Sequence, residues 1–154
     1  MDRELLRVCN ERMNTADVVY MTTMRDGYPC TRAMLNLRNR DQYPDHQHLY
    51  ESHRDDLMTY LITNTSSRKQ KEIAEDPRVC LYFCHPSEFF GLSLVGDLQI
   101  VEDMETKLAV WADNLAQYVP TGKPTDPDYS LLQFFPIEIS GWNQGRKFAF
   151  AILS

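Results

Sequence analysis

Hydrophobic and polar positions along this chain follow patterns that predict mostly β-strands. Runs rich in β-branched and aromatic residues predict six strands, which span residues 18–24, 30–37, 57–63, 78–84, 89–102 and 131–139. Asp26-Gly27 is typical of a tight hairpin turn between the first two strands. Residues 78–84 show little alternation, which predicts a strand buried on both faces. Gly91 and Gly96 indicate bends or bulges in the fifth strand, and Pro136 indicates an edge or a break in the sixth.

The remaining chain predicts three short helices and several loops. Apolar residues at helical spacing predict a helix over residues 5–13. A second helix is predicted over residues 67–75, and Asp103 is a candidate cap for a third. The core-facing stripe predicted for the third helix consists of Met104, Leu108, Trp111, Leu115 and Tyr118. The loops expected from polar sequence are residues 38–56, 120–128 and 141–147. Hairpin-connected strands with a few helices predict a β-barrel with helices at its periphery.

Composition narrows the classes of protein to consider. A length of 154 residues suits a single domain over residues 1–154. The net charge of −6, from 16 Lys and Arg against 22 Asp and Glu, argues against non-specific nucleic-acid binding. No apolar run reaches about 18 residues, so no membrane span is expected, and the N-terminus lacks the apolar region of a signal peptide. We therefore expect a cytoplasmic protein, in which Cys80 and Cys84 are buried small apolar residues in a reducing compartment.

The most informative segment runs from residue 61 to residue 73, where a predicted strand passes through hydroxyl residues into a basic helix. First-turn amides of a helix lack intrahelical partners and carry partial positive charge, so they favour an anion. Ser67 is placed to cap the helix, and Gln70 to reciprocate as a capping box. Arg68 and Lys69 oppose the helix dipole at a cost of roughly 0.3–1 kcal/mol each. They indicate a phosphate site, with a solvated helix start as the plainer alternative.

Other polar clusters carry weaker signals. Asp45, His46, His48 and His53 lie close together in the predicted 38–56 loop, where histidines can form a metal site. A loop of this length is more often a solvated insertion, so no metal is expected. His85 has no partner that the sequence identifies, and no general-acid role is assigned to it.

Three pieces of sequence carry a family resemblance: residues 31–34 after a glycine turn, residues 62–79 around the strand–helix junction, and residues 136–142 near the end. In this order they resemble the FMN-binding split-barrel family of pyridoxamine 5′-phosphate oxidase-like proteins, in its general-stress-protein branch. The resemblance covers about residues 15–143. It implies a mainly β fold, a six-stranded split β-barrel with peripheral helices, and a homodimer that binds two flavins at its interface.

The resemblance also implies FMN as the cofactor. It places the FMN phosphate at Ser67, Arg68 and Lys69, with Arg32 beside the phosphate and the ribityl chain. Peptide groups of residues 33–35 and 62–64 would lie along the flavin edge, and Trp142 would reach the ring, usually from the partner subunit. The implied cofactor-binding residues are Arg32, Ala33, Met34, Leu35, Thr63, Asn64, Ser67, Arg68, Lys69 and Trp142.

The chain departs from true pyridoxamine 5′-phosphate oxidases at three places. Leu37 stands where those enzymes carry a lysine, and Phe90-Gly91 stands where a glutamine is expected. Residues 115–124 lack the Tyr, Arg and Ser set that binds the substrate phosphate. Oxidation of vitamin B6 is therefore not expected.

The expected function is flavin-mediated hydride or electron transfer to a small molecule that the sequence does not define. A reduced nicotinamide is the expected electron donor, and no residue stands out as a catalytic acid or base. Two alternatives stay open, because one fold can serve several functions. The chain could bind a flavin, deazaflavin or haem without turnover, or it could act through its dimer surface without any cofactor.

Overall fold

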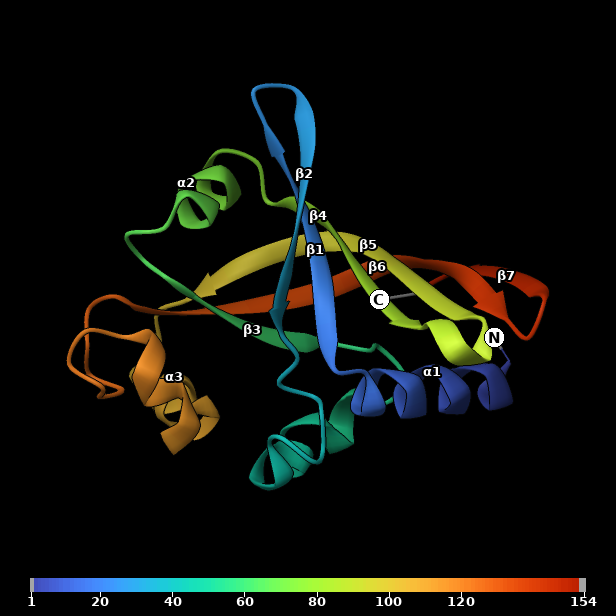
Figure 1. The fold of residues 1–154 in the computed structure, drawn as a ribbon, viewed down its shortest axis with the longest axis horizontal. Helices are drawn as coiled ribbons and strands as arrows, with labels where there is room; N and C mark the ends of the chain where they lie inside the picture. The colour runs from blue at the N-terminus through green and yellow to red at the C-terminus, as the bar shows by residue number, and fades with distance from the viewer. Residues whose placement is uncertain (1, 153–154) are drawn as a thin grey trace.

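The computed structural model describes residues 2–152, and within them seven strands form one antiparallel sheet (Figure 1). The strands are β1 (Val18–Arg25), β2 (Tyr28–Leu35), β3 (Thr59–Asn64), β4 (Arg78–His85), β5 (Phe90–Val101), β6 (Tyr129–Asn143) and β7 (Arg146–Ala151). Six of them follow the order β2-β1-β4-β5-β6-β3, and β7 pairs with β6. The six-strand path curls into a half-barrel, which confirms the predicted split barrel.

Strand β6 organises the sheet because it has two partners on one edge. Residues Tyr129–Phe134 pair with β3, residues Glu138–Asn143 pair with β7, and β5 pairs along most of the opposite edge. The register between β5 and β6 shifts at Gly96, which faces Pro136. This confirms the predicted bulge, since proline has no N–H for the ladder. Gly91, by contrast, pairs in regular register on both sides.

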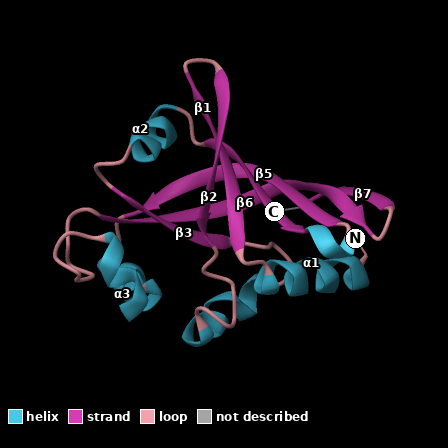
Figure 2. Cartoon of the chain, viewed as in Figure 1, coloured by secondary structure: helices cyan, strands magenta, loops and turns pink. Residues whose placement is uncertain are grey.

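The helices lie at the edges of the sheet (Figure 2). They are α1 (Arg3–Thr15), α2 (Arg68–Glu75) and α3 (Met104–Val110), with 3₁₀ segments at Pro44–His53, Pro86–Glu88 and Asp113–Tyr118. Asp2 caps α1 and Asp103 caps α3, each by accepting hydrogen bonds from backbone amides of the first turn. The predicted loop 38–56 is therefore partly helical, and it packs into the core through Tyr43, His46 and Tyr50.

Two hydrophobic clusters form the core. The larger one fills the half-barrel and is closed by α1, with residues such as Cys9, Met21, Phe83, Leu92 and Phe134. The smaller one lies under α3 and the 38–56 segment, with residues such as Leu37, Tyr50, Met58, Leu115 and Tyr129. The second cluster forms the wall behind the site described below.

Three sequence-based expectations for the elements were wrong. The loop predicted after residue 140 is instead the end of β6 and a seventh strand, β7. Strand β4 is not buried on both faces, since its side chains alternate between buried and more exposed positions. Its more exposed face carries the small residues Cys80 and Cys84, which is why the sequence shows little alternation. The third helix ends at Val110, so the predicted stripe breaks, and Met104 and Leu108 are 46% and 48% exposed.

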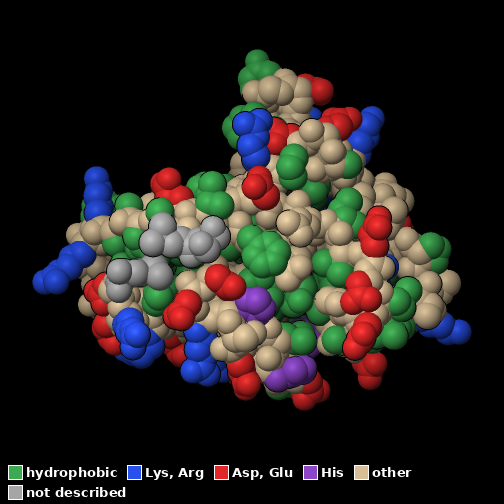
Figure 3. Space-filling model, turned by 180° about the vertical axis from the view of Figure 1, so that it is seen from behind, with side chains coloured by type: hydrophobic (Ala, Val, Ile, Leu, Met, Phe, Trp, Pro, Cys, Tyr) green, Lys and Arg blue, Asp and Glu red, His purple; other side chains and the backbone are tan. Residues whose placement is uncertain are grey.

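The surface agrees with the acidic composition. Seen from behind, Asp and Glu side chains spread over the molecule with hydrophobic side chains between them (Figure 3). Within residues 2–152, every helix is too short or too polar to span a membrane.

The bulge at Gly96 generates a prediction about stability. An added methyl in Gly96→Ala would collide with the backbone carbonyl of Phe135 and lie 2.8 Å from the Cα of Pro136. We expect a loss of about 2–3 kcal/mol in the free energy of unfolding, measured by urea titration, because backbone atoms cannot move aside easily. The matched control is Gly145→Asn, where nothing lies within 4 Å of the added Cβ and Asn tolerates a positive φ. Equal stability of the two variants would contradict this account of the bulge.

Candidate functional site

The site lies where the two ends of the split sheet face each other. Strand β2 pairs only with β1, and β3 pairs only with β6, among the strands of residues 2–152. Each therefore has an edge whose backbone groups are not used by the sheet. A cavity of about 310 Å³ lies between these edges. Its lining residues are Val18, Ala33, Met34, Leu35, Ile62, Thr63, Asn64, Lys69, Trp111, Leu115, Tyr118, Val119 and Tyr129.

Six of the ten residues named from sequence meet in this cavity. Ala33, Met34 and Leu35 come from β2, Thr63 and Asn64 from the end of β3, and Lys69 from the first turn of α2. Figure 1 shows α2 and α3 beside the same end of β3. Strands far apart in sequence thus supply the polar edges, and the segment that follows α3 supplies an apolar wall through Trp111, Leu115, Tyr118 and Val119.

Ser67 caps α2 as predicted, and its Oγ accepts a hydrogen bond of 3.2 Å from the amide of Gln70. The hydroxyl of Thr63 lies 3.0 Å from the Ser67 hydroxyl and joins the strand to the cap. The predicted capping box is wrong, because the Gln70 side chain turns away and accepts a hydrogen bond of 3.0 Å from Ser130. The helix start is therefore tied to β3 and β6 through side chains.

The first turn of α2 keeps free hydrogen-bond donors. The backbone amides of Arg68 and Lys69 have no acceptor within residues 2–152. Their side chains likewise form no ion pair or hydrogen bond with that part of the chain, and Arg68 is exposed while Lys69 is half-buried. Two cations at the positive end of a helix dipole are repelled by the dipole and by each other. A bound anion offsets this repulsion. This geometry suits a phosphate group.

Asp128 holds the loop that leads into α2, and it was not predicted from sequence. Its carboxylate accepts hydrogen bonds of 2.8 Å from the amide of Ser66 and 2.8 Å from the side chain of Asn64. The backbone amide of Ser66 contributes most to lowering the pKa of Asp128. Asn64 is also bonded to the carbonyl of Tyr118, at 2.8 Å. Only the pairing of β3 with β6 brings Asp128 here, so no local pattern could have identified it.

Arg32 occupies a different position from the cavity residues. Its guanidinium donates to Glu72 at 2.9 Å and to the hydroxyl of Thr23 at 2.5 Å. Arg25 donates to the other oxygen of Glu72 at 2.6 Å. Burial opposes the ionisation of Glu72, but hydrogen bonds from Thr23 and Arg25 and the nearby arginine charges outweigh it and lower its pKa to about 2. Arg32 thus joins β2 to α2 through a buried carboxylate.

Trp142 lies far from the cavity within one protomer. It sits near the C-terminal end of β6, whereas the cavity contains Tyr129 at the start of that strand, roughly 40 Å away along an extended strand. The ring is 43% exposed, and the ammonium of Lys147 lies 5.1 Å from its centre. A contact between Trp142 and a ligand in the cavity would therefore need a second subunit.

The histidine cluster of the 38–56 segment does not converge. His46 is buried and stacks on Tyr43 at 5.3 Å between ring centres, while His53 contacts Asp56 at 2.9 Å. Across residues 2–152, no three His, Cys, Asp or Glu side chains are grouped to hold a metal ion.

Comparisons with known proteins agree with this architecture. A family model described as pyridoxamine 5′-phosphate oxidase matches residues 5–143. Among solved structures, a Clostridium acetobutylicum protein related to general stress protein 26 of B. subtilis, of the pyridoxinephosphate oxidase family, is similar. It is 28% identical over 99% of this chain and 97% of that chain, with a TM-score of 0.76. The chain matches none of the curated proteins.

Two more distant structures share the fold alone. A Nostoc punctiforme protein described as pyridoxamine 5′-phosphate oxidase-related and FMN binding is 15% identical, over 98% of this chain and 94% of that chain, with a TM-score of 0.62. A heme binding protein from Mycobacterium smegmatis is also 15% identical, over 92% of this chain and 56% of that chain, with a TM-score of 0.62. The same barrel therefore accommodates different ligands.

The buried carboxylate at Glu72 generates a prediction about pH. Because its folded-state pKa is lowered from 4.5 to about 2, its contribution to stability is present above pH 4.5 and is lost as the pH falls toward 2. We expect Glu72→Gln to lower the free energy of unfolding by about 2–3 kcal/mol near neutral pH. The difference from the wild type should shrink steadily below pH 4.5. Denaturant unfolding across this range measures it, and a difference independent of pH would contradict the assignment.

Proposed function

The chain belongs to the pyridoxamine 5′-phosphate oxidase family, and we propose that it binds FMN between β2 and β3 as an oxidoreductase. The observation that carries this proposal is the first turn of α2, where the amides and side chains of Arg68 and Lys69 have no partner within residues 2–152 and Lys69 lines the cavity. FMN supplies the hydride or electron transfer, and the protein supplies binding and orientation. The proposed electron donor is a reduced nicotinamide that docks transiently.

The residues present fit the two chemically different ends of FMN. At the phosphate end, Ser67 offers a hydroxyl, Arg68 a guanidinium fork and Lys69 a point charge, which are the usual partners of a phosphate. The Arg32 guanidinium is instead paired with Glu72, which it shares with Arg25. We therefore expect Arg68 and Lys69, rather than Arg32, to dominate phosphate affinity.

At the ring end, the cavity offers backbone edges and apolar walls. The open edges of β2 and β3 present peptide N–H and C=O groups that suit the polar rim of a planar heterocycle. Met34, Ile62 and Leu115 supply apolar surface for its faces. Tyr129 donates its hydroxyl to the carbonyl of Lys107 at 2.9 Å, and burial raises its pKa, so it stays protonated. The lining thus orients a ring but offers no carboxylate or imidazole for proton transfer.

The same lining favours FMN over haem. Haem needs an axial ligand, most often His or Cys. Among the described residues around the cavity, neither type is present, and Met34 is the one sulfur-containing side chain.

We also propose that two copies of the chain pair through the outer face of the sheet. Tyr20 and Tyr82 are opposite each other on β1 and β4, and they are 40% and 41% exposed. The exposed Trp142 belongs to the same group of aromatic residues. Small residues stand opposite these side chains on strand β5, with Ser93 paired to Tyr82 and Gly91 paired to Trp142. Exposed apolar surface of this kind marks interaction sites. A dimer would also allow Trp142 of one subunit to approach the cavity of the other.

The phosphate site generates a test with a built-in comparison. We expect Arg68→Ala with Lys69→Ala to weaken FMN binding about 100-fold or more, because two charged contacts of about 1.5–3 kcal/mol each are lost. Riboflavin, which lacks the phosphate, should lose far less affinity. Flavin fluorescence titration measures both ligands.

A matched control removes two positive charges from α1 and β7, at the end of the sheet opposite α2 (Figure 1), as Arg3→Ala with Arg146→Ala. It should bind FMN like the wild type. FMN affinity unchanged by the Arg68 and Lys69 substitutions would contradict the phosphate site. A Soret band in the absorbance spectrum of the purified protein would identify haem as the cofactor instead of FMN. Turnover by the flavin-free protein would contradict the proposal that it acts as an FMN-dependent oxidoreductase.

The outer face generates a separate prediction about assembly. In sedimentation velocity, the wild type should have twice the mass of the 18.0 kDa chain. Tyr82→Glu should shift it to a monomer, because a buried unpaired charge costs several kcal/mol at an interface. Tyr28→Glu, at the 75% exposed tip of the β1–β2 hairpin, is the control and should remain dimeric. A monomeric wild type at micromolar concentration would reject the pairing.

A further inference from the structure

A second cavity lies between α1 and the segment that follows β2. Its volume is about 600 Å³, and it shares no lining residue with the cavity between β2 and β3. The charged side chains that line it are Arg3, Arg7, Arg40, Arg54, Glu11 and Asp55. We call it the arginine groove, and nothing in the proposed function uses it.

The groove gathers positive charge on an acidic protein, although its lining also includes Glu11 and Asp55. Arg7 pairs with Glu4 at 2.6 Å in an exposed ion pair. It contains four of the 16 Lys and Arg residues of a chain whose net charge is −6. Arg40 pairs with Glu11 at 2.5 Å, but both side chains are about half exposed, so the pair is readily exchanged for another anion. Arg54 has no carboxylate partner within residues 2–152. Its positive charge is available to a ligand.

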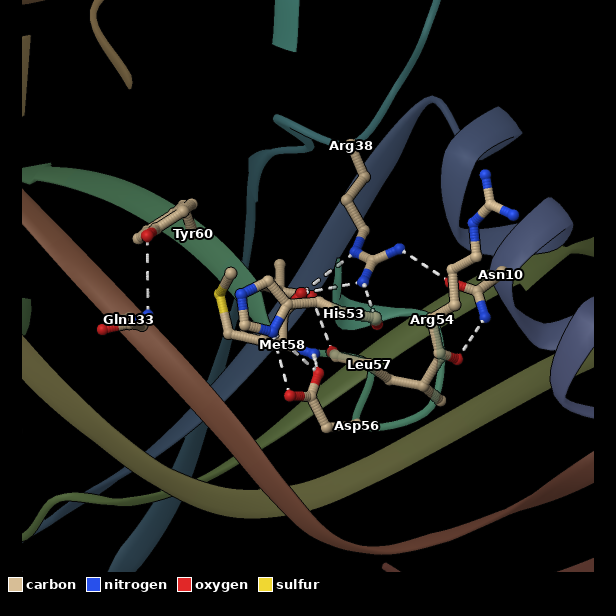
Figure 4. Close-up of polar contacts among 10 residues, drawn as sticks. Asn10, Arg38, His53, Arg54, Asp56, Leu57, Met58, Tyr60 and Gln133 are labelled. Carbon is tan, nitrogen blue, oxygen red and sulfur yellow. Dashed lines mark hydrogen bonds and ion pairs between the residues drawn. The ribbon is translucent and has the colours of Figure 1, made fainter. Parts of the chain in front are cut away.

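A buried cation lies directly behind the groove. The Arg38 side chain is fully buried, and its guanidinium donates to the side-chain oxygen of Asn10 at 3.1 Å (Figure 4). It also donates to the side-chain oxygen of Asn14 at 3.3 Å. Both asparagines line the groove. The other acceptors of Arg38 are carbonyls, including that of Met58 at 2.8 Å, and the ring of Tyr50 lies 4.6 Å from it.

These neutral partners satisfy the hydrogen bonds of Arg38 but do not cancel its charge. Burial is the main cause that lowers the pKa of Arg38, to about 10, so the side chain remains charged at neutral pH. Interactions between charges are stronger in a weakly screened interior than in water. The field of Arg38 therefore adds to that of the four arginines at the rim.

The backbones of two rim arginines, Arg40 and Arg54, are tied to α1 before any ligand binds. The side chain of Asn10 donates to the carbonyl of Arg54 at 2.7 Å, and the amide of Arg40 donates to the carbonyl of Asn14 at 3.0 Å. Figure 4 shows the Arg54 side chain extending along α1, beside Asn10. Fixing these backbones in advance reduces the ordering cost of binding.

We propose that the arginine groove binds a multiply charged phosphate anion, either free pyrophosphate or the phosphate chain of a nucleotide. Guanidinium groups bind phosphate oxygens in pairs, and several arginines around one groove suit a chain of phosphates better than a single carboxylate. The volume lies within the usual range of about 300–1,000 Å³ for ligand sites. The polar floor of asparagine side chains disfavours an apolar ligand.

The test is calorimetric titration of inorganic pyrophosphate, and separately of ATP, into the full-length protein at low ionic strength. Arg68→Ala with Lys69→Ala is the background for all measurements, so that binding at α2 does not contribute. On this background, Arg40→Gln with Arg54→Gln should weaken pyrophosphate binding about tenfold or more. Glu11→Gln should strengthen it, because it removes the carboxylate that competes for Arg40.

The matched control is Lys71→Gln with Lys123→Gln, which removes the same charge outside the groove and should leave binding unchanged. Tighter binding of ATP than of pyrophosphate would identify a nucleotide, and equal binding would identify the phosphate chain alone. Failure of both anions to bind at millimolar concentration would overturn the proposal. So would equal affinity in the Arg40/Arg54 variant, provided that circular dichroism shows it to be folded.

Discussion

Strand β6 divides one of its edges between two partners, and the rest of the structure depends on this division. Because β3 pairs with the first part of β6 and β7 with the last part, β3 ends up opposite β2 without a ladder between them. Backbone N–H and C=O groups on both strands therefore remain available. The turn from β3 into α2 and the apolar segment after α3 then enclose the space between them. The cavity follows from how the sheet is paired rather than from any one side chain.

Local chemistry explains which features could be predicted from sequence. Asp26-Gly27 adopts the positive φ values of a tight turn, Ser67 caps α2, and Gly96 opposite Pro136 forms a bulge. The turn and the cap each depend on a few neighbouring residues, so their types suffice. The same holds for the strand–helix junction, whose cations are unusual in any context. The bulge joins residues far apart in sequence, but glycine and proline each mark an interrupted ladder on their own strand.

Features that depend on tertiary pairing were not predicted. Asp128 reaches the start of α2 only because β3 pairs with β6, and Gln70 leaves its own cap because Ser130 offers another partner. The stripe expected on the third helix fails because the chain bends at Trp111, which packs on Tyr129 at 5.2 Å between ring centres. Six of the ten residues named from the family resemblance line the cavity, while Arg32 turns to Glu72 and Trp142 lies at the far end of β6.

The two open edges also bear on the fate of the chain before any ligand arrives. An exposed strand edge is a template on which another chain can add a strand, and natural proteins protect such edges with charges, bulges or covering segments. Here the segment after α3 covers one side of the gap, while residues 33–35 and 62–64 border the cavity itself. A ligand seated there would shield both edges from intermolecular pairing. Aggregation of newly made chains would then depend on the cellular supply of that ligand.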